Sequence, residues 1–158
     1  MASGFYNQGL LDVTNGAIDL DTDTLKLMLV DTSYTFDPDH DVVDNGGNDA
    51  TDPSFNEIVA TNYTVGFSGA GRKTVTITSG VNDTNNRADF AIADVTWTAL
   101  GGGTNDTIGG AILIEERTND TDSRLIAFFD LTDTPTNGSD VTLDFNSLAS
   151  GGNIRFSA

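Results

Sequence analysis

Short apolar segments with a period of two, separated by polar turns, are the feature that most constrains the fold of this chain. In KTVTITS (73–79) and DVTLDF (140–145) apolar and polar residues alternate, which places successive side chains on opposite faces of a strand. Segments of this kind recur along the chain, and no long stretch has the 3.6-residue period of a helix. The pattern predicts a mainly β protein, an antiparallel β-sandwich or barrel.

Polar turns rich in Asp, Asn and Gly connect most of the expected strands. These strands are 24–31, 63–67, 72–78, 87–92, 95–99, 110–116, 124–130, 140–145 and 153–156.

Two short helices complete the expected elements. Residues 3–13 are predicted to form an N-terminal helix that ends before Asn15-Gly16. A second short helix is predicted near residues 53–60, with Asp52 as its N-cap and Pro53 at its first position. Both are minor parts of a β-rich chain.

The chain is strongly acidic. It has 21 Asp and three Glu against seven basic residues, and its formal net charge is −17. Nucleic acid and anionic membranes bind clusters of Lys and Arg, and only Arg72-Lys73 are adjacent, so both are excluded as partners. An Asp-rich, Lys-poor surface fits a turn-rich β protein and also fits adaptation to high salt, where screening weakens self-repulsion.

The remaining composition predicts one domain, 1–158. There is no cysteine, so neither disulfides nor thiol chemistry are expected. The first residues lack the basic and apolar regions of a signal peptide, and no apolar run approaches the ~20 residues that span a bilayer. We therefore expect a chain that is neither exported by the standard route nor inserted in a membrane.

No enzyme is expected. The one histidine, His40, lies in an acidic loop without a nucleophile elbow or a phosphate-binding loop nearby. The glutamates do not form a pair in an apolar context. We interpret His40 as an exposed loop residue, and we expect no catalytic residue and no cofactor other than calcium.

Four carboxylates in the acidic loop 31–52 are candidate calcium ligands. They are Asp37, Asp39, Asp41 and Asp44. The first three match the positions with which an EF-hand loop begins, but Val42 and Asn48 replace the glycine and glutamate that complete it. A looser calcium site is one hypothesis, and a solvated acidic loop is the other.

A second acidic run, Asp19, Asp21 and Asp23, precedes the strand at 24–31. An extended backbone would align these carboxylates on one face, where like charges repel unless a cation or salt screens them. A metal site and a solvated acidic face are the two interpretations.

Six apolar and aromatic side chains are candidate contacts with a partner protein, against the alternative of core packing. They belong to the N-terminal segment 1–16, the loop 31–52 and the second helix. The six are Phe5, Tyr6, Leu10, Tyr34, Phe36 and Phe55.

A family resemblance lies in a series of short motifs. In order these are FYN-x-x-L (5–10), DL-x-TDTLKLMLVD (19–31), YTF (34–36), DHD (39–41), SRLIAF (123–128) and TPTNGSDVTL (134–143). They make the chain similar to small β-rich virion structural proteins of tailed phages and haloarchaeal tailed viruses, of the capsid decoration, turret or tail-associated type.

The resemblance implies a virion structural role and brings no catalytic residues. Our first expectation is a capsid decoration, cement or turret protein, made in the host cytoplasm and placed on the capsid surface. It would contact the major capsid protein or other virion proteins and form a homo-oligomer, preferably a trimer at threefold positions. A tail, neck or baseplate component is the first alternative, and a calcium-dependent carbohydrate-binding module is the second. The Asp-rich, Lys-poor surface departs from the family toward what a salt-loving host requires.

Overall fold

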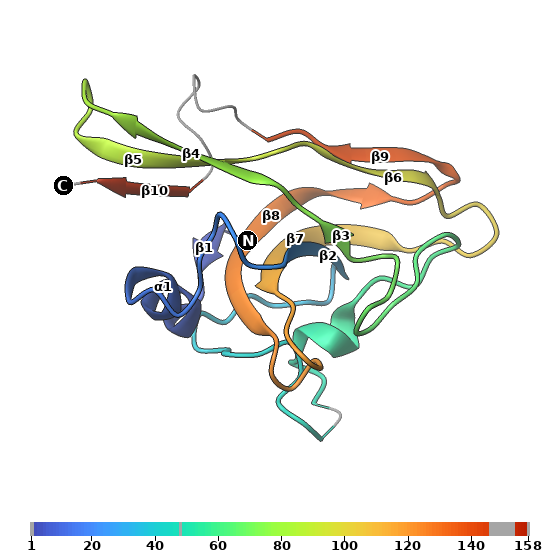
Figure 1. Ribbon diagram of the computed structural model, residues 1–158. Coiled ribbons are helices and arrows are strands. Elements are labelled where there is room, and N and C mark those ends of the chain that lie inside the picture. The colour runs from blue at the N-terminus through green and yellow to red at the C-terminus, as the bar shows by residue number, and fades with distance from the viewer. Residues whose placement is uncertain (1, 48, 146–153, 158) are drawn as a thin grey trace.

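The structure is a computed structural model that describes residues 2–47, 49–145 and 154–157 (Figure 1). Their elements are β1 (Gly4–Phe5), α1 (Asn7–Thr14), β2 (Leu25–Asp31), the 3₁₀ helix η1 (Pro53–Asn56), β3 (Lys73–Thr74), β4 (Ile77–Asn82), β5 (Arg87–Ile92), β6 (Val95–Leu100), β7 (Thr107–Glu115), β8 (Arg124–Pro135), β9 (Ser139–Leu143) and β10 (Ile154–Ser157). The strand pairs are antiparallel. The predicted mainly β fold class with a short N-terminal helix is confirmed.

The first layer is a five-stranded sheet with the strand order β1-β8-β7-β2-β3. The long strands β8, β7 and β2 lie in its middle, where Leu113 of β7 pairs with Leu27 of β2 and with Ala127 of β8. From Leu27 to Val30 every side chain of β2 is buried. A strand without alternation in burial is covered on both faces. Other parts of the chain must therefore pack against each face of this sheet.

The second layer covers one of these faces (Figure 1). β5 and β6 follow each other closely in the chain; β4 and β10 pair with β5, and β9 pairs with β6. Trp97 of β6 is 1% exposed and packs in the same cluster as Ile92 of β5 and Leu27 of β2. Its indole N–H donates to the carbonyl of Gly71 at 2.6 Å. Two layers around one apolar cluster make a sandwich.

The loop that follows β2 covers the opposite face of the five-stranded sheet. Tyr34 and Val43 of this loop are buried in one cluster with Met28 and Ile112 of the sheet. The backbone N–H of Val43 also donates to the carbonyl of Ser123, just before β8, at 3.1 Å. The first part of the predicted acidic loop therefore packs against this face of the sheet.

Close contact between α1 and β8 requires a glycine. A β-carbon on Gly9 would lie 2.1 Å from the carbonyl oxygen of Leu125, far inside van der Waals contact. An ion pair also ties the helix to β8: Oδ2 of Asp12 lies 3.4 Å from Nε of Arg124. Within the helix, Gln8 donates a hydrogen bond to Asp12 at 2.7 Å.

We expect Gly9→Ala to lower the free energy of unfolding by about 1–3 kcal/mol, because the added methyl group must displace the backbone of β8. Leu11→Ala on the same helix is the control: Leu11 is 53% exposed, so a change within about 0.5 kcal/mol is expected. Urea unfolding followed by circular dichroism measures both. Equal stability of Gly9→Ala and the unaltered chain would contradict this packing.

The start of the N-terminal helix was predicted too early. Gly4 and Phe5 are not helical, because they pair with Phe128 and Ala127 of β8. The predicted end is confirmed, since α1 stops at Thr14.

The second predicted helix is only the short η1. From Glu57 the backbone is extended, with ψ of 132°, because the next N–H, that of Ile58, donates to Leu29 of β2 at 3.1 Å. Pairing with the sheet thus ends the helix that Pro53 begins.

One predicted strand, 63–67, is a loop. The prediction at 72–78 corresponds to two strands, β3 and the start of β4, while the prediction at 87–92 has the bounds of β5. The prediction at 153–156 overlaps β10, and Asn153 lies outside the described residues.

Candidate functional site

The carboxylates of the predicted calcium loop accept hydrogen bonds from nearby protein groups. Asp37 accepts from the backbone N–H of Asp39 at 3.0 Å, and Asp44 from that of Gly46 at 2.7 Å. Asp39 itself accepts from the side-chain amide of Asn7 at 2.6 Å. Short acidic side chains characteristically cap turns in this way.

These four aspartates do not converge. In the parts of the chain that the structure describes, no three or more His, Cys, Asp or Glu side chains form a group that could hold a metal ion. Asp37 and Asp44 cap turns and Asp39 binds Asn7, so three of the four carboxylates have partners within the protein.

The second acidic run is a turn and not part of a strand. The backbone N–H of Asp19 donates to Asp23 at 2.7 Å, and that of Asp21 donates to Asp19 at 2.9 Å. Hydrogen bonds from the backbone of Asp21 and from Thr22 hold the pKa of Asp19 below its usual value. β2 begins only at Leu25, so these carboxylates are not aligned along a strand face as predicted.

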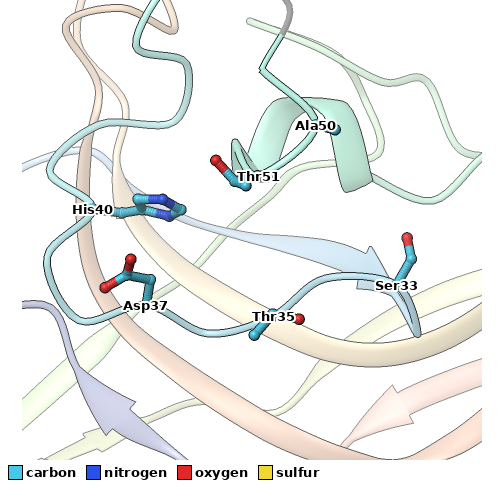
Figure 2. A pocket seen from close by; sticks show the side chains of 6 residues that line it. All are labelled: Ser33, Thr35, Asp37, His40, Ala50 and Thr51. Atoms are coloured by element: carbon cyan, nitrogen blue, oxygen red, sulfur yellow. The ribbon is translucent and has the colours of Figure 1, made fainter.

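His40 lines a shallow cavity of about 210 Å³ (Figure 2). Its ring lies between Asp37 and Thr51 in this view, and the other lining residues are Ser33, Thr35 and Ala50.

The hydroxyl of Ser33 in this cavity is not paired with His40. His40 is only partly exposed, contrary to the interpretation as an exposed loop residue, because it lies in this cavity. Its Nδ1 is buried and has no hydrogen-bond partner among the described residues. The hydroxyl of Ser33 lies instead 2.5 Å from a carboxylate oxygen of Asp31 and 3.0 Å from Oδ1 of Asn56. A histidine activates a hydroxyl through a direct hydrogen bond, and these two groups do not make one.

Three of the predicted partner contacts form an aromatic cluster in the interior. The hydroxyls of Tyr6 and Tyr34 lie 2.7 Å apart, and Phe36 packs edge-on against Tyr6 and stacks on Phe128. Burial raises the pKa of Tyr34 to about 12 and also raises the pKa of Tyr6, so both phenols are neutral. Tyr6 and Tyr34 are 0% and 3% exposed. In this chain they hold the loop on the sheet and are not open to a partner.

The other three predicted contacts differ in exposure. Phe5 is half-buried against the main core, Leu10 lies at the surface of α1, and Phe55 of η1 is 61% exposed. Phe55 is thus the predicted aromatic side chain that is most open to a partner.

Phe55 belongs to a group of exposed apolar side chains that we call the apolar rim. The rim consists of Phe55, Val59, Val65 and Phe67, all exposed. The two segments that carry these side chains are joined by a hydrogen bond at 3.0 Å from the N–H of Gly66 to Glu57. Phe55 and Val59 lie two residues to either side of Glu57, and Val65 and Phe67 lie one residue to either side of Gly66.

A buried ion-pair network fixes the two segments of the rim. Arg72 donates to both carboxylate oxygens of Glu57, at 3.0 and 2.8 Å, and to both of Asp120, at 2.5 and 3.1 Å. The hydroxyl of Tyr63 donates to Glu57 at 2.9 Å and accepts from the N–H of Leu29 at 3.0 Å. Burial works against the charge of Arg72, but its two carboxylate partners outweigh burial and raise its pKa.

Sequence reasoning did not identify Val59, Val65 and Phe67 as surface residues. The segment 63–67 was predicted as a strand, which would bury one face of it. Gly66 and the four small residues Ser68-Gly69-Ala70-Gly71 after Phe67 were the available sign of a loop, but nothing in the sequence shows that Glu57 binds this loop.

No family model, curated protein or solved structure matches this chain. Within the described residues, no helix has the length and apolar character needed to cross a membrane.

Proposed function

We propose that this chain is a structural protein of a tailed-virus particle that decorates the exterior of the capsid and stabilises the shell. The observation that carries the proposal is the apolar rim: four exposed apolar side chains on two segments that Glu57 joins by hydrogen bonds, in a chain with a net charge of −17. The motif resemblance at residues 5–41 supports the same role.

The rim has the character of a protein contact. The centre of an interface between proteins is depleted in charge and enriched in aromatic residues, and the rim contains two phenylalanines and two valines. Burying such a side chain completely contributes roughly 1.5–3 kcal/mol. Because the chain is strongly acidic, an uncharged contact also avoids repulsion from an acidic neighbour.

The frame beneath the rim favours a permanent contact. Glu57, Arg72 and Asp120 hold the two rim segments before a partner arrives, so little conformational entropy is lost on binding. A subunit that binds only the assembled shell stabilises that shell by mass action. The expected partner is the major capsid protein, and the expected oligomer on the shell is a trimer at threefold positions.

Copy number in purified particles tests this location. A decoration protein is expected on the order of hundreds of copies per particle, because it follows the icosahedral symmetry of the shell, whereas a neck or baseplate component is expected in about a dozen. Quantitative mass spectrometry against the major capsid protein measures the ratio. A ratio that corresponds to about a dozen copies would assign the chain to the tail, and absence from washed particles would refute a virion role.

A further inference from the structure

The outer edge of β4 is the exposed strand edge that lacks the usual protection against pairing. Proteins protect such edges with charged residues, proline, short strands or a covering segment. β4 runs through Ile77-Thr78-Ser79-Gly80-Val81-Asn82, six residues without charge or proline. It is the last strand of its sheet, and no described residue pairs with its outer side.

The other edges are protected. β1 and β3 have two residues each, β10 has four, and β9 contains a charged residue, Asp140. β8 extends past β1 with Asp133 and Pro135.

β6 also lacks charge, but another segment binds the end of its outer side. There the N–H of Gly101, just after β6, donates to the carbonyl of Thr61 at 2.8 Å, and Asn62 donates to the carbonyl of Ala99 at 2.8 Å. β4 is thus a six-residue edge without charge, and no described residue pairs with its outer side.

The backbone groups that β4 leaves open can be assigned. Ala93 donates to Thr76 at 2.9 Å, and inward and outward groups alternate along an antiparallel ladder. The outward N–H and C=O groups therefore belong to Ile77, Ser79 and Val81. In agreement, the outward N–H of Val75 already binds the carbonyl of Leu25 in β2 at 3.0 Å.

We propose that β4 pairs antiparallel with β4 of a second copy of this chain. Centred on Ser79, the pairing gives three hydrogen-bonded residue pairs: Ser79 with its own copy, and Ile77 with Val81 in both directions. Each pair exchanges two hydrogen bonds. The two three-stranded sheets then become one continuous sheet across a twofold axis.

The side chains of β4 favour β4 of a second copy as the strand that pairs with this edge. Val81 is 81% exposed, and this register places it beside Ile77 of the second copy, an apolar cross-strand pair on one face. Thr78 then lies opposite Gly80 on the other face. The pairing brings no two charges of β4 together, which matters for two chains that each have a net charge of −17.

Salt is expected to promote this association. The two acidic bodies repel each other over the Debye length, which falls to about 3 Å at 1 M salt, while the strand pairing itself has no charge to screen. We expect a dissociation constant on the order of 10–100 µM in about 2 M NaCl and weaker binding in dilute buffer. This inference concerns the isolated chain and does not depend on a role in the virion.

Sedimentation equilibrium of the purified chain, from about 5 to 200 µM in 2 M NaCl, tests the proposal. Ser79→Lys places two like charges directly opposite each other and is expected to weaken dimerisation by at least about 10-fold. Ser79→Asp is expected to do the same. An equimolar mixture of the two variants is expected to form a heterodimer, because opposite charges then meet at the centre of the pairing.

Thr98→Lys is the matched control, because Thr98 is exposed on β6 and the substitution changes the net charge by the same amount as Ser79→Lys. The Thr98→Lys variant is expected to dimerise like the unaltered chain. Circular dichroism confirms that each variant is folded. A chain that stays monomeric at 200 µM, or a dimer that Ser79→Lys leaves intact, would overturn the proposal. Failure of the mixed variants to associate would overturn the register.

Discussion

Replacing Arg72 with leucine is expected to lower the free energy of unfolding by about 3–5 kcal/mol. The substitution leaves the carboxylate of Glu57 buried without its counter-ion, and it also removes the pairing of Asp120. The side chains of Arg72 and Glu57 are 0% and 1% exposed, so water cannot replace the lost partner. Arg72→Lys is expected to recover only part of the loss, because an ammonium group cannot make two bidentate contacts.

Urea unfolding followed by tryptophan fluorescence measures this effect. Trp97, the single tryptophan, donates its indole N–H to Gly71 and therefore reports on the segment next to Arg72. The control is Arg117→Leu, which removes an ion pair with Glu115 whose side chains are 27% and 12% exposed; because water reaches Arg117, it is expected to cost only about 1 kcal/mol. If Arg72→Leu costs no more than Arg117→Leu, the ion-pair network is not what holds the rim.

Phe55→Asp and Phe67→Asp are each expected to weaken binding to the capsid by about 30-fold or more, the effect of losing an aromatic residue at the centre of an interface. Each also introduces a negative charge into an apolar contact. Phe55→Asp is expected to change stability by no more than about 0.5 kcal/mol, since Phe55 is 61% exposed. Phe67 is 39% exposed, so Phe67→Asp is expected to cost about 1 kcal/mol, and circular dichroism confirms that it is folded. Co-sedimentation with particles stripped of the chain measures the binding.

Leu11→Asp is the matched control for the rim variants. Leu11 is also exposed and apolar, but it lies on α1, in the N-terminal segment that the sequence suggested as a contact element. It is expected to bind like the unaltered chain. Loss of binding in Leu11→Asp with normal binding of both rim variants would move the contact to the N-terminal segment.

The period-two pattern predicted most of the fold because burial on one face determines it. The segment 87–92 appears as β5 with the same bounds, and residues 24–31 contain β2. Strand order could not be predicted, because the alternation of a segment does not show which neighbour it pairs with. In the structure β2 pairs with β7, whose residues lie about 80 positions later in the chain.

The contact residues could be predicted only in part. Tyr34 and Phe36 are apolar residues in a polar loop, and the same pattern describes a loop that binds a partner and a loop that folds back on its own sheet. The hydrogen bond between Tyr6 and Tyr34 distinguishes these alternatives, and it joins residues 28 positions apart. Phe55 could be predicted because it lies near the polar loop, but its neighbours in the rim depend on Glu57 and Gly66, whose contact the sequence does not show.

A cryo-electron microscopy reconstruction of the virus particle tests the proposed capsid role most directly. We predict that the two-layer sandwich lies on the outer surface of the head at symmetry-related positions, with Phe55 and Phe67 facing the major capsid protein. A head surface without this fold, or a sandwich whose apolar rim faces solvent, would contradict the account.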